Sequence, residues 1–138
     1  MKKSKYNKAS GYFKKLAEIM AKLRGPQGCP WDRRQTHKSL VPYLFSEAEE
    51  VRLAVRKKDW KNLEEELGDI LLQVVFHSQL AEEAGLFDLA GVVNGLNKKL
   101  KRRHPHVFGG KKLKNHKEVI KQWEEIKKLE KQKKVSSS

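Results

Sequence analysis

Three features are scarce in this sequence of 138 residues: cysteine, long apolar runs and the alternating pattern of β-strands. Its single cysteine, Cys29, excludes an intramolecular disulfide framework and a zinc site built from several cysteines. No apolar run approaches the roughly 20 residues that a membrane-spanning helix needs. The basic N-terminus has no apolar stretch behind it, so a secretory signal is not expected. We expect a soluble cytoplasmic protein that makes no membrane contact.

Apolar residues as a whole are also limited, at 38% of the sequence against 35% charged residues. The length corresponds to one small domain. A chain of this size with so little apolar material often completes its hydrophobic core in an oligomer. We therefore expect a protein that associates with itself rather than a monomer.

The charge is strongly basic but unevenly distributed. Lys and Arg number 31 against 17 Asp and Glu, which gives a net charge of +14. Residues 47–83 nevertheless hold ten acidic and five basic residues, so this segment carries −5 and the remainder of the chain +19. Two interpretations fit this pattern. The acidic centre is either a cation site that serves a polyanionic substrate held by basic flanks, or a solvated acidic face of a helix.

Apolar residues recur at helical spacing along almost the whole chain. The pattern predicts an all-α fold of five helices, at about 10–24, from near 36–40 to 56, 60–84, 89–104 and 116–132. Segments 25–30 and 106–110 are predicted to be loops, and Pro42 is tolerable only in the first turn of the second helix. One helical domain is expected at 10–132, between a basic N-terminal tail at 1–9 and a disordered C-terminal tail at 133–138.

Local signals mark several helix ends. Asp59 is expected to cap the start of the third helix, and Asn115 with Glu118 resembles a capping box for the last one. His104 and His106, which flank a proline, are expected to cap the fourth helix or to contact phosphate. His77 is expected to be a hydrogen-bonded histidine of the core.

Four carboxylates stand where a helical wheel places apolar surface. In the second helix, Glu47 falls within the apolar stripe and Glu50 at its edge, whereas Glu49 faces away. The third helix is apolar nearly all round over its second half, which predicts burial on more than one face. Glu66 and Asp69 point into its second apolar sector.

These carboxylates need a counter-charge, because an ionised carboxylate costs several kcal/mol to desolvate without a partner. Lys or Arg would supply it in a salt-bridged core. The inward faces of the two helices, however, offer no obvious base. A hard divalent cation with oxygen ligands, most naturally Mg²⁺, is therefore the favoured interpretation.

The order of the motifs carries a family resemblance. Glu47-Ala-Glu-Glu50 is followed by Glu66-Leu-Gly-Asp69. Around them stand, in order, Gly28-Cys-Pro-Trp-Asp32, Gln35-Thr-His37, Glu65-Glu-Leu-Gly-Asp-Ile-Leu-Leu-Gln-Val-Val-Phe-His77, Arg102-Arg-His-Pro-His-Val-Phe108 and Trp123-Glu-Glu-Ile-Lys127. This series resembles the ExxE…ExxD signature and flanking motifs of MazG-type nucleoside triphosphate pyrophosphohydrolases, within the all-α NTP pyrophosphohydrolase superfamily. The similarity covers about residues 12–130.

The resemblance implies a helical bundle with a four-helix core completed by dimerisation. It also implies Mg²⁺-dependent hydrolysis, with Mn²⁺ as a possible substitute, of nucleoside triphosphates to the monophosphate and pyrophosphate. A homodimer is expected and a tetramer is the alternative; broad specificity would suit the clearing of nucleotide pools. The implied metal-binding and catalytic residues are Glu47, Glu50, Glu66 and Asp69, with Glu47 as the candidate proton acceptor. The implied substrate-binding residues are Lys99, Arg103 and Lys127 for the phosphates and Trp123 near the base.

One departure from the family pattern leaves other functions open. The family usually has two glutamates at the start of its first motif, and here the first is Ser46. The protein is then either an active hydrolase or a weak nucleotide binder with the same fold. Lys99 and Arg103 also suit a solvated basic face, and Trp123 suits simple packing. A third possibility is a helical nucleic-acid-binding module that uses the basic flanks and tails.

Overall fold

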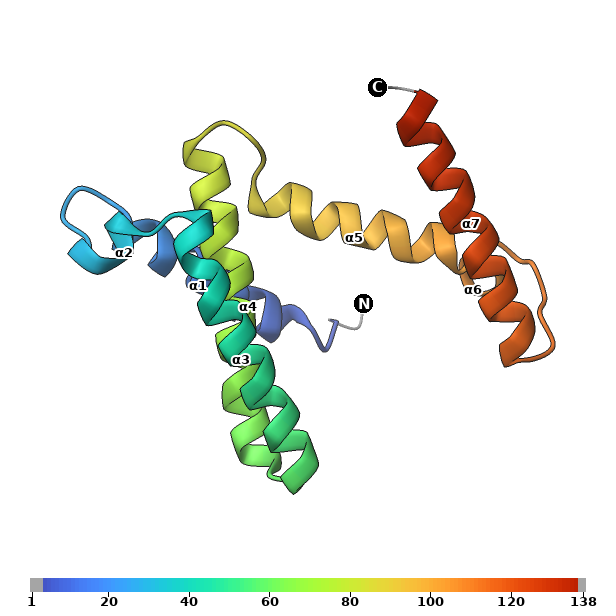
Figure 1. Ribbon diagram of the computed structural model, residues 1–138, viewed down its shortest axis with the longest axis horizontal. Helices are drawn as coiled ribbons and strands as arrows, with labels where there is room; N and C mark the ends of the chain where they lie inside the picture. The colour runs from blue at the N-terminus through green and yellow to red at the C-terminus, as the bar shows by residue number, and fades with distance from the viewer. Residues whose placement is uncertain (1–3, 137–138) are drawn as a thin grey trace. The chain divides into compact units, whose positions relative to one another are not determined.

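Seven α-helices make up the computed structural model, which describes residues 4–136. They are α1 (Asn7–Leu23), α2 (Pro30–Arg34), α3 (His37–Lys57), α4 (Trp60–Glu83), α5 (Leu89–Arg103), α6 (Pro105–Phe108) and α7 (His116–Ser136) (Figure 1). Within the described residues there is no strand. The predicted all-α class is therefore confirmed.

The five predicted helices correspond to α1, α3, α4, α5 and α7. The sequence did not predict the two short helices α2 and α6. Each begins with a proline, and these prolines had been interpreted only as residues that end a helix. Pro30 opens α2 and Pro105 opens α6, and the fixed φ of proline suits a first helical turn. The prediction of a loop at 106–110 is therefore wrong for its first three residues.

Pro42 lies deeper in its helix than predicted. Thr36 caps α3, and its hydroxyl accepts a hydrogen bond from the backbone N–H of Ser39 at 3.0 Å. Pro42 is consequently the sixth residue of the helix, beyond the first turn. Because proline has no N–H, the carbonyl of Lys38 lacks its usual i→i+4 hydrogen bond there.

The chain divides into two compact units, one ending at Leu89 and the other beginning at Ala90. In the first unit, α3 and α4 form an antiparallel hairpin, and α1 packs against α4. The turn between α3 and α4 needs only Lys58, in a left-handed conformation with φ of +57°, and Asp59. As predicted, Asp59 caps α4, accepting a hydrogen bond from the N–H of Asn62 at 3.2 Å.

The hydrophobic core of the first unit lies toward the C-terminal half of α4. It consists of Met20, Leu40, Val75, Phe76 and Leu80, which are all at least nine-tenths buried. Arg24 fastens this end of the unit: its guanidinium pairs with Glu83 of α4 at 2.6 Å and donates to the carbonyl of Asp32 at 2.7 Å. The half of the hairpin nearer its turn lies outside this core.

The apolar stripe of α4 that faces away from Glu66 and Asp69 remains largely exposed within the described residues. Leu67, Leu71 and Val74 follow one another at helical spacing and are 50%, 38% and 38% exposed. On α3, Phe45 is 72% exposed. The second half of α4 is nevertheless buried on more than one face, as predicted, because Phe76 and Ser78 lie on nearly opposite sides of the helix and are 2% and 3% exposed.

The second unit comprises α6, α7 and α5 from Ala90 onward. Asn115 caps α7 by accepting from the N–H of Glu118 at 3.1 Å, as predicted, and the carboxylate of Glu118 accepts from the N–H of Lys114 at 2.6 Å. The helix continues to Ser136, and α1 begins at Asn7. The domain limits at residues 10 and 132 stay predictions; of the expected tails, residues 1–3 and 137–138 lie outside the described part.

Among the helices described, none combines the length and the apolar character that a membrane span requires.

Candidate functional site

The α3–α4 hairpin brings three of the predicted carboxylates together. Glu47 projects from α3, and Glu66 and Asp69 lie one turn apart on α4. One carboxylate oxygen from each residue lies within 4.8 Å of the other two, and all three side chains are half-buried. The i,i+3 spacing on α4 places its two carboxylates on the same face, opposite the side chain that α3 contributes. We call this group the carboxylate cluster.

Electrostatic crowding in the cluster is strongest at Glu66. Its pKa is raised from 4.5 to about 7, first by desolvation and then by a hydrogen bond with Glu47. The negative charges of Glu47, Asp69 and Glu50 raise this pKa further. In the absence of a cation, Glu66 is therefore about half protonated at neutral pH.

Glu50 lies at the margin of the cluster. It is exposed and outside the group of three, although its charge still acts on the pKa of Glu66. Glu49 is engaged elsewhere, as the helical wheel predicted: it pairs with Arg52 at 2.6 Å, and this hydrogen bond lowers the pKa of Glu49. Ser46 is exposed.

The carboxylates are less buried than the sequence predicted. The helical wheel predicted that Glu66 and Asp69 point into a buried apolar sector of α4. In the structure, the core around Val75 and Phe76 lies about 9 Å further along α4. Solvent therefore reaches the carboxylate cluster in the single chain.

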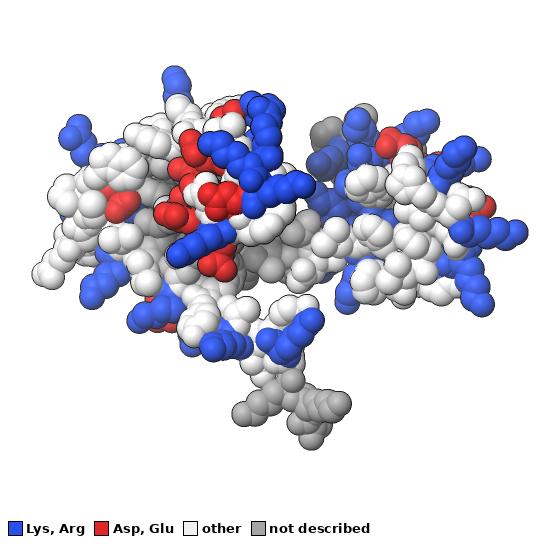
Figure 2. All heavy atoms as spheres, turned by 90° about the horizontal axis from the view of Figure 1, so that it is seen from below, with Lys and Arg blue, Asp and Glu red and all other residues white. Residues whose placement is uncertain are grey.

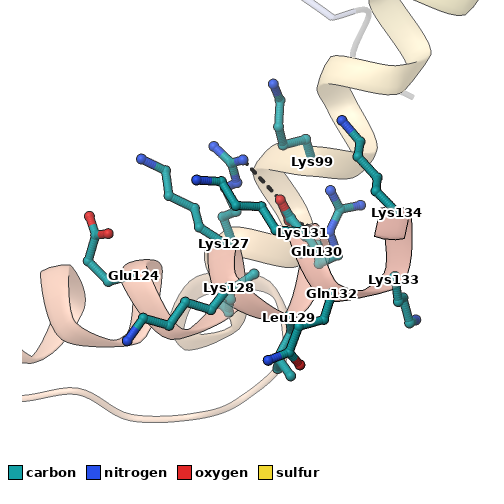
Figure 3. Close-up of a pocket in the computed structure, with 13 residues that line it drawn as sticks. Lys99, Glu124, Lys127, Lys128, Leu129, Glu130, Lys131, Gln132, Lys133 and Lys134 are labelled. Carbon is teal, nitrogen blue, oxygen red and sulfur yellow. Dashed lines mark hydrogen bonds and ion pairs between the residues drawn. The ribbon is translucent and has the colours of Figure 1, made fainter. Parts of the chain in front are cut away.

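The second unit assembles the predicted substrate-binding residues. The ring of Trp123 has the Nζ of Lys127 at 4.6 Å from its centroid and the guanidinium carbon of Arg103 at 5.9 Å. Lys99, Arg103 and Lys127 line a groove of about 1060 Å³ between α5 and α7 (Figure 3). Trp123 is not part of the lining, so its expected contact with a base stays a prediction.

Arg103 is held in place by a residue that sequence reasoning missed. Its guanidinium pairs with Glu130 at 2.9 Å, and Arg102 pairs with the same carboxylate at 2.7 Å. These two hydrogen bonds lower the pKa of Glu130 to about 2. Arg103 Nε and Trp123 Nε1 are buried with no hydrogen-bond partner, so two donors of this cluster remain uncompensated.

The histidines are engaged with neighbouring groups. His104 Nδ1 lies 2.6 Å from the carbonyl of Leu100, which confirms that it caps the end of α5. His77 is hydrogen-bonded, as predicted, with its Nδ1 2.8 Å from that of His37, but it is half-buried rather than part of the core. Desolvation and the charge of His37 lower the pKa of His77.

The acidic residues are concentrated in the first unit, which holds 13 of the 17, whereas the basic residues are divided almost equally between the two units. Figure 2 shows acidic side chains gathered on the first unit, with Lys and Arg on both units. From residue 90 onward the chain has 15 basic and 4 acidic residues, a net charge of +11. The second unit is therefore much the more basic of the two.

Comparison with known proteins places these residues in a family. A family model described as the MazG nucleotide pyrophosphohydrolase domain matches residues 35–108, just over half of the chain. The match includes the carboxylate cluster, Lys99 and Arg103, and it ends before Trp123 and Lys127.

Individual relatives extend the similarity over most of the chain. A protein of Thermotoga maritima named nucleoside triphosphate pyrophosphohydrolase/pyrophosphatase MazG is 54% identical, over 91% of this chain and 48% of its own length. The nucleoside triphosphate pyrophosphohydrolase of Escherichia coli K12 is 44% identical, over 90% and 48%. The chain thus spans about half the length of these curated relatives.

A solved structure has the same arrangement of helices. The crystal structure of a mazG-related protein from Thermotoga maritima superposes with a TM-score of 0.69 at 35% identity. The similarity covers 83% of this chain and 98% of that one.

Proposed function

Because this chain belongs to the MazG nucleotide pyrophosphohydrolase family, we propose that it hydrolyses nucleoside triphosphates to nucleoside monophosphates and pyrophosphate. The observation that carries the proposal is the carboxylate cluster, in which Glu47, Glu66 and Asp69 converge and the pKa of Glu66 rises to about 7. Repulsion of this kind is relieved when a cation binds.

The residues of the cluster fit a magnesium ion. Every donor is a carboxylate oxygen, which is the ligand type that Mg²⁺ and Mn²⁺ share. We assign Glu47, Glu66, Asp69 and the more exposed Glu50 as the ligands. A bound divalent ion supplies charge neutralisation for phosphate oxygens and a more acidic water.

The chain's own groups carry the other parts of the reaction. We assign Glu47, which is hydrogen-bonded to Glu66, as the acceptor of the proton of the attacking water. Lys99, Arg103 and Lys127 hold the triphosphate, and Trp123 packs against the base. Glu130 orients Arg103 before any ligand arrives, so less side-chain entropy is lost on binding.

We propose that the functional form is a homodimer. Leu67, Leu71 and Val74 form an apolar stripe that no element of the first unit covers, and Phe45 adds a large exposed ring on α3. Pairing two such hairpins through these apolar residues would yield a four-helix bundle. A tetramer is the alternative. The molar mass measured by light scattering after size-exclusion chromatography distinguishes a dimer from a tetramer.

The family resemblance, not the shape of the groove, supports our proposal for the substrate range and the cellular role. We propose broad specificity among nucleoside triphosphates and a cytoplasmic role in clearing surplus or damaged nucleotides. Ser46 removes one negative charge beside Glu47 relative to the usual family pattern. The rate is therefore expected to be modest, and a nucleotide binder with almost no turnover is the competing proposal.

Product analysis tests the proposal directly. The protein is incubated with a panel of nucleoside triphosphates, once with Mg²⁺ and once with EDTA. Monophosphate and pyrophosphate that form only with Mg²⁺ support the proposed reaction, whereas diphosphate and phosphate contradict it. Binding of a triphosphate without product identifies the competing nucleotide binder.

Two matched variants locate the chemistry. Asp69→Asn is expected to abolish turnover while the helical content, measured by circular dichroism, stays unchanged. Glu49→Gln removes a carboxylate from the same hairpin, but one that pairs with Arg52 outside the cluster, so its turnover is expected to match the wild type. Normal turnover in Asp69→Asn would remove the cluster from the mechanism.

A further inference from the structure

The groove of the second unit carries more positive charge than a single triphosphate requires. Its basic lining consists of Lys99, Arg102, Arg103, Lys127, Lys128, Lys131, Lys133 and Lys134. Glu124 and Glu130 are the acidic residues of the lining. Eight basic and two acidic residues give the groove a net charge of +6. This value already counts Glu130, which pairs with two of the arginines. A nucleoside triphosphate brings only about four negative charges.

The basic side chains are also spread over a longer path than three phosphates occupy. The lining follows α7 from Glu124 to Lys134, which is eleven residues or about 16 Å along the helix. Along a stacked nucleic-acid strand, phosphates recur at about 3.4 Å. The groove is thus long enough for about five of them.

The side chains are arranged to follow a linear anion. Lys127, Lys131 and Lys134 succeed one another at four and three residues, so they lie on one face of α7. Figure 3 shows them on the side of the helix toward Lys99 of α5, with Glu130 between them. A row of cations backed by a second helix suits an extended strand better than a compact anion.

We propose that the second unit binds the phosphate backbone of a single-stranded nucleic acid in this groove. The groove shares Lys99, Arg103 and Lys127 with the proposed triphosphate site, so the inference is tested with oligonucleotides that carry no triphosphate. Specificity for sequence is not expected, because lysines contact phosphates and do not read bases. The alternative of a nucleic-acid-binding function, raised by the basic flanks of the sequence, is thereby placed on α5 and α7.

A lipid surface is a poorer fit to the same features. Helices that lie on membranes present an apolar face opposite their lysines. Here Gln122 and Trp123 of α7 are instead buried or half-buried within the unit, and the lysines border a concave groove that also holds Glu130. Anionic vesicles nevertheless belong in the experiment.

The experiment measures fluorescence anisotropy of labelled oligouridylates with a 5′-hydroxyl, of 2, 5 and 12 nucleotides, against the full chain at 50 to 200 mM NaCl. About four phosphate contacts predict a slope near −3 for the logarithm of the association constant against that of the salt concentration, a fall of roughly 50-fold over this range. Affinity is expected to rise steeply from 2 to 5 nucleotides and little beyond.

Two double variants with the same loss of charge separate the groove from the net charge. Lys131→Gln with Lys134→Gln is expected to reduce the slope by about 1.4, the contribution of two phosphate contacts. Lys14→Gln with Lys15→Gln removes two exposed lysines of α1 and is expected to leave the slope unchanged.

Several results would overturn the inference. They are absence of binding at 50 mM NaCl, equal weakening in both double variants, inorganic triphosphate binding as tightly as the 5-nucleotide strand, and anionic vesicles binding while the oligonucleotides do not. Loss of nucleoside triphosphate hydrolysis would leave it intact, because the oligonucleotides carry no triphosphate.

Discussion

Proton competition at Glu66 provides a quantitative test of the carboxylate cluster. A pKa of about 7 means that a proton and a metal ion compete for this side chain near neutral pH. If Glu66 must be ionised to bind Mg²⁺, the apparent dissociation constant is multiplied by roughly 1.1 at pH 8, by about 2 at pH 7 and by about 11 at pH 6. With the ordinary pKa of 4.5, the factor stays near 1 throughout.

The assay is isothermal titration of the full chain with Mg²⁺ at pH 6, 7 and 8, in two buffers that differ in ionisation enthalpy. The expected outcome is a tenfold weakening from pH 8 to pH 6, with close to one proton released per ion bound at pH 6. Glu47→Gln removes the hydrogen-bond partner and a neighbouring charge, so it should weaken binding and also flatten the pH dependence. Glu49→Gln, outside the cluster, should reproduce the wild type.

The same shift has a consequence for stability, with a definite sign. The folded pKa of Glu66 lies above its unfolded value, so between about 4.5 and 7 the folded protein binds more protons than the unfolded one. Without metal, stability should therefore decrease as the pH rises through this window, and Mg²⁺ should restore it. An affinity for Mg²⁺ that does not change between pH 6 and 8 would refute the reasoning.

Four further predictions concern other parts of the molecule. Glu130→Gln should lower the melting temperature at pH 7 but not near pH 2, since the depressed pKa of Glu130 stabilises the folded state only while the carboxylate is ionised; thermal denaturation at both pH values checks this. Leu71→Asp should yield monomers in light scattering, with helical content retained, because Leu71 is exposed in the single chain. Phe76→Ala should cost about 3–5 kcal/mol of unfolding free energy in urea denaturation, since Phe76 is 2% exposed in the core. Ser46→Glu should raise turnover under saturating Mg²⁺; an unchanged rate would show that Ser46 does not limit catalysis.

Helical periodicity was sufficient to predict the five long helices, because each is long enough for its apolar residues to recur at helical spacing, even in α5, where no residue is buried. It was insufficient for α2 and α6, which are too short for periodicity to develop. Pro30 and Pro105 are ambiguous in sequence, since proline both ends one helix and opens the next. Whether such a proline begins a helix depends on the residues after it, which must adopt helical backbone dihedral angles to form the first hydrogen bonds of the helix.

The carboxylate cluster was predictable because its members are close in sequence within each helix and the hairpin turn is short. A wheel gives the direction of Glu66 and Asp69 but cannot show what stands opposite them. Only the structure shows that Glu47 meets Glu66 and that Glu50 stays at the margin. The burial of Glu66 and Asp69 was overestimated because a wheel carries no position along the helix axis, and the buried residues of their sector, Phe76 and Leu80, stand further along α4.

Glu130 illustrates what a pattern search misses altogether. It lies 27 residues from Arg103 in a lysine-rich segment, where a single glutamate looks like part of a solvated face. In the structure it neutralises part of the charge of two adjacent arginines and fixes their guanidinium groups at the floor of a basic groove. An acid among many bases is costly to replace only when it is paired in this way, and the pairing lowers the pKa of Glu130 to about 2. Counting charges along the chain therefore shows which segment attracts an anion. Which basic side chains are oriented to bind that anion depends on the acidic residues that pair with them.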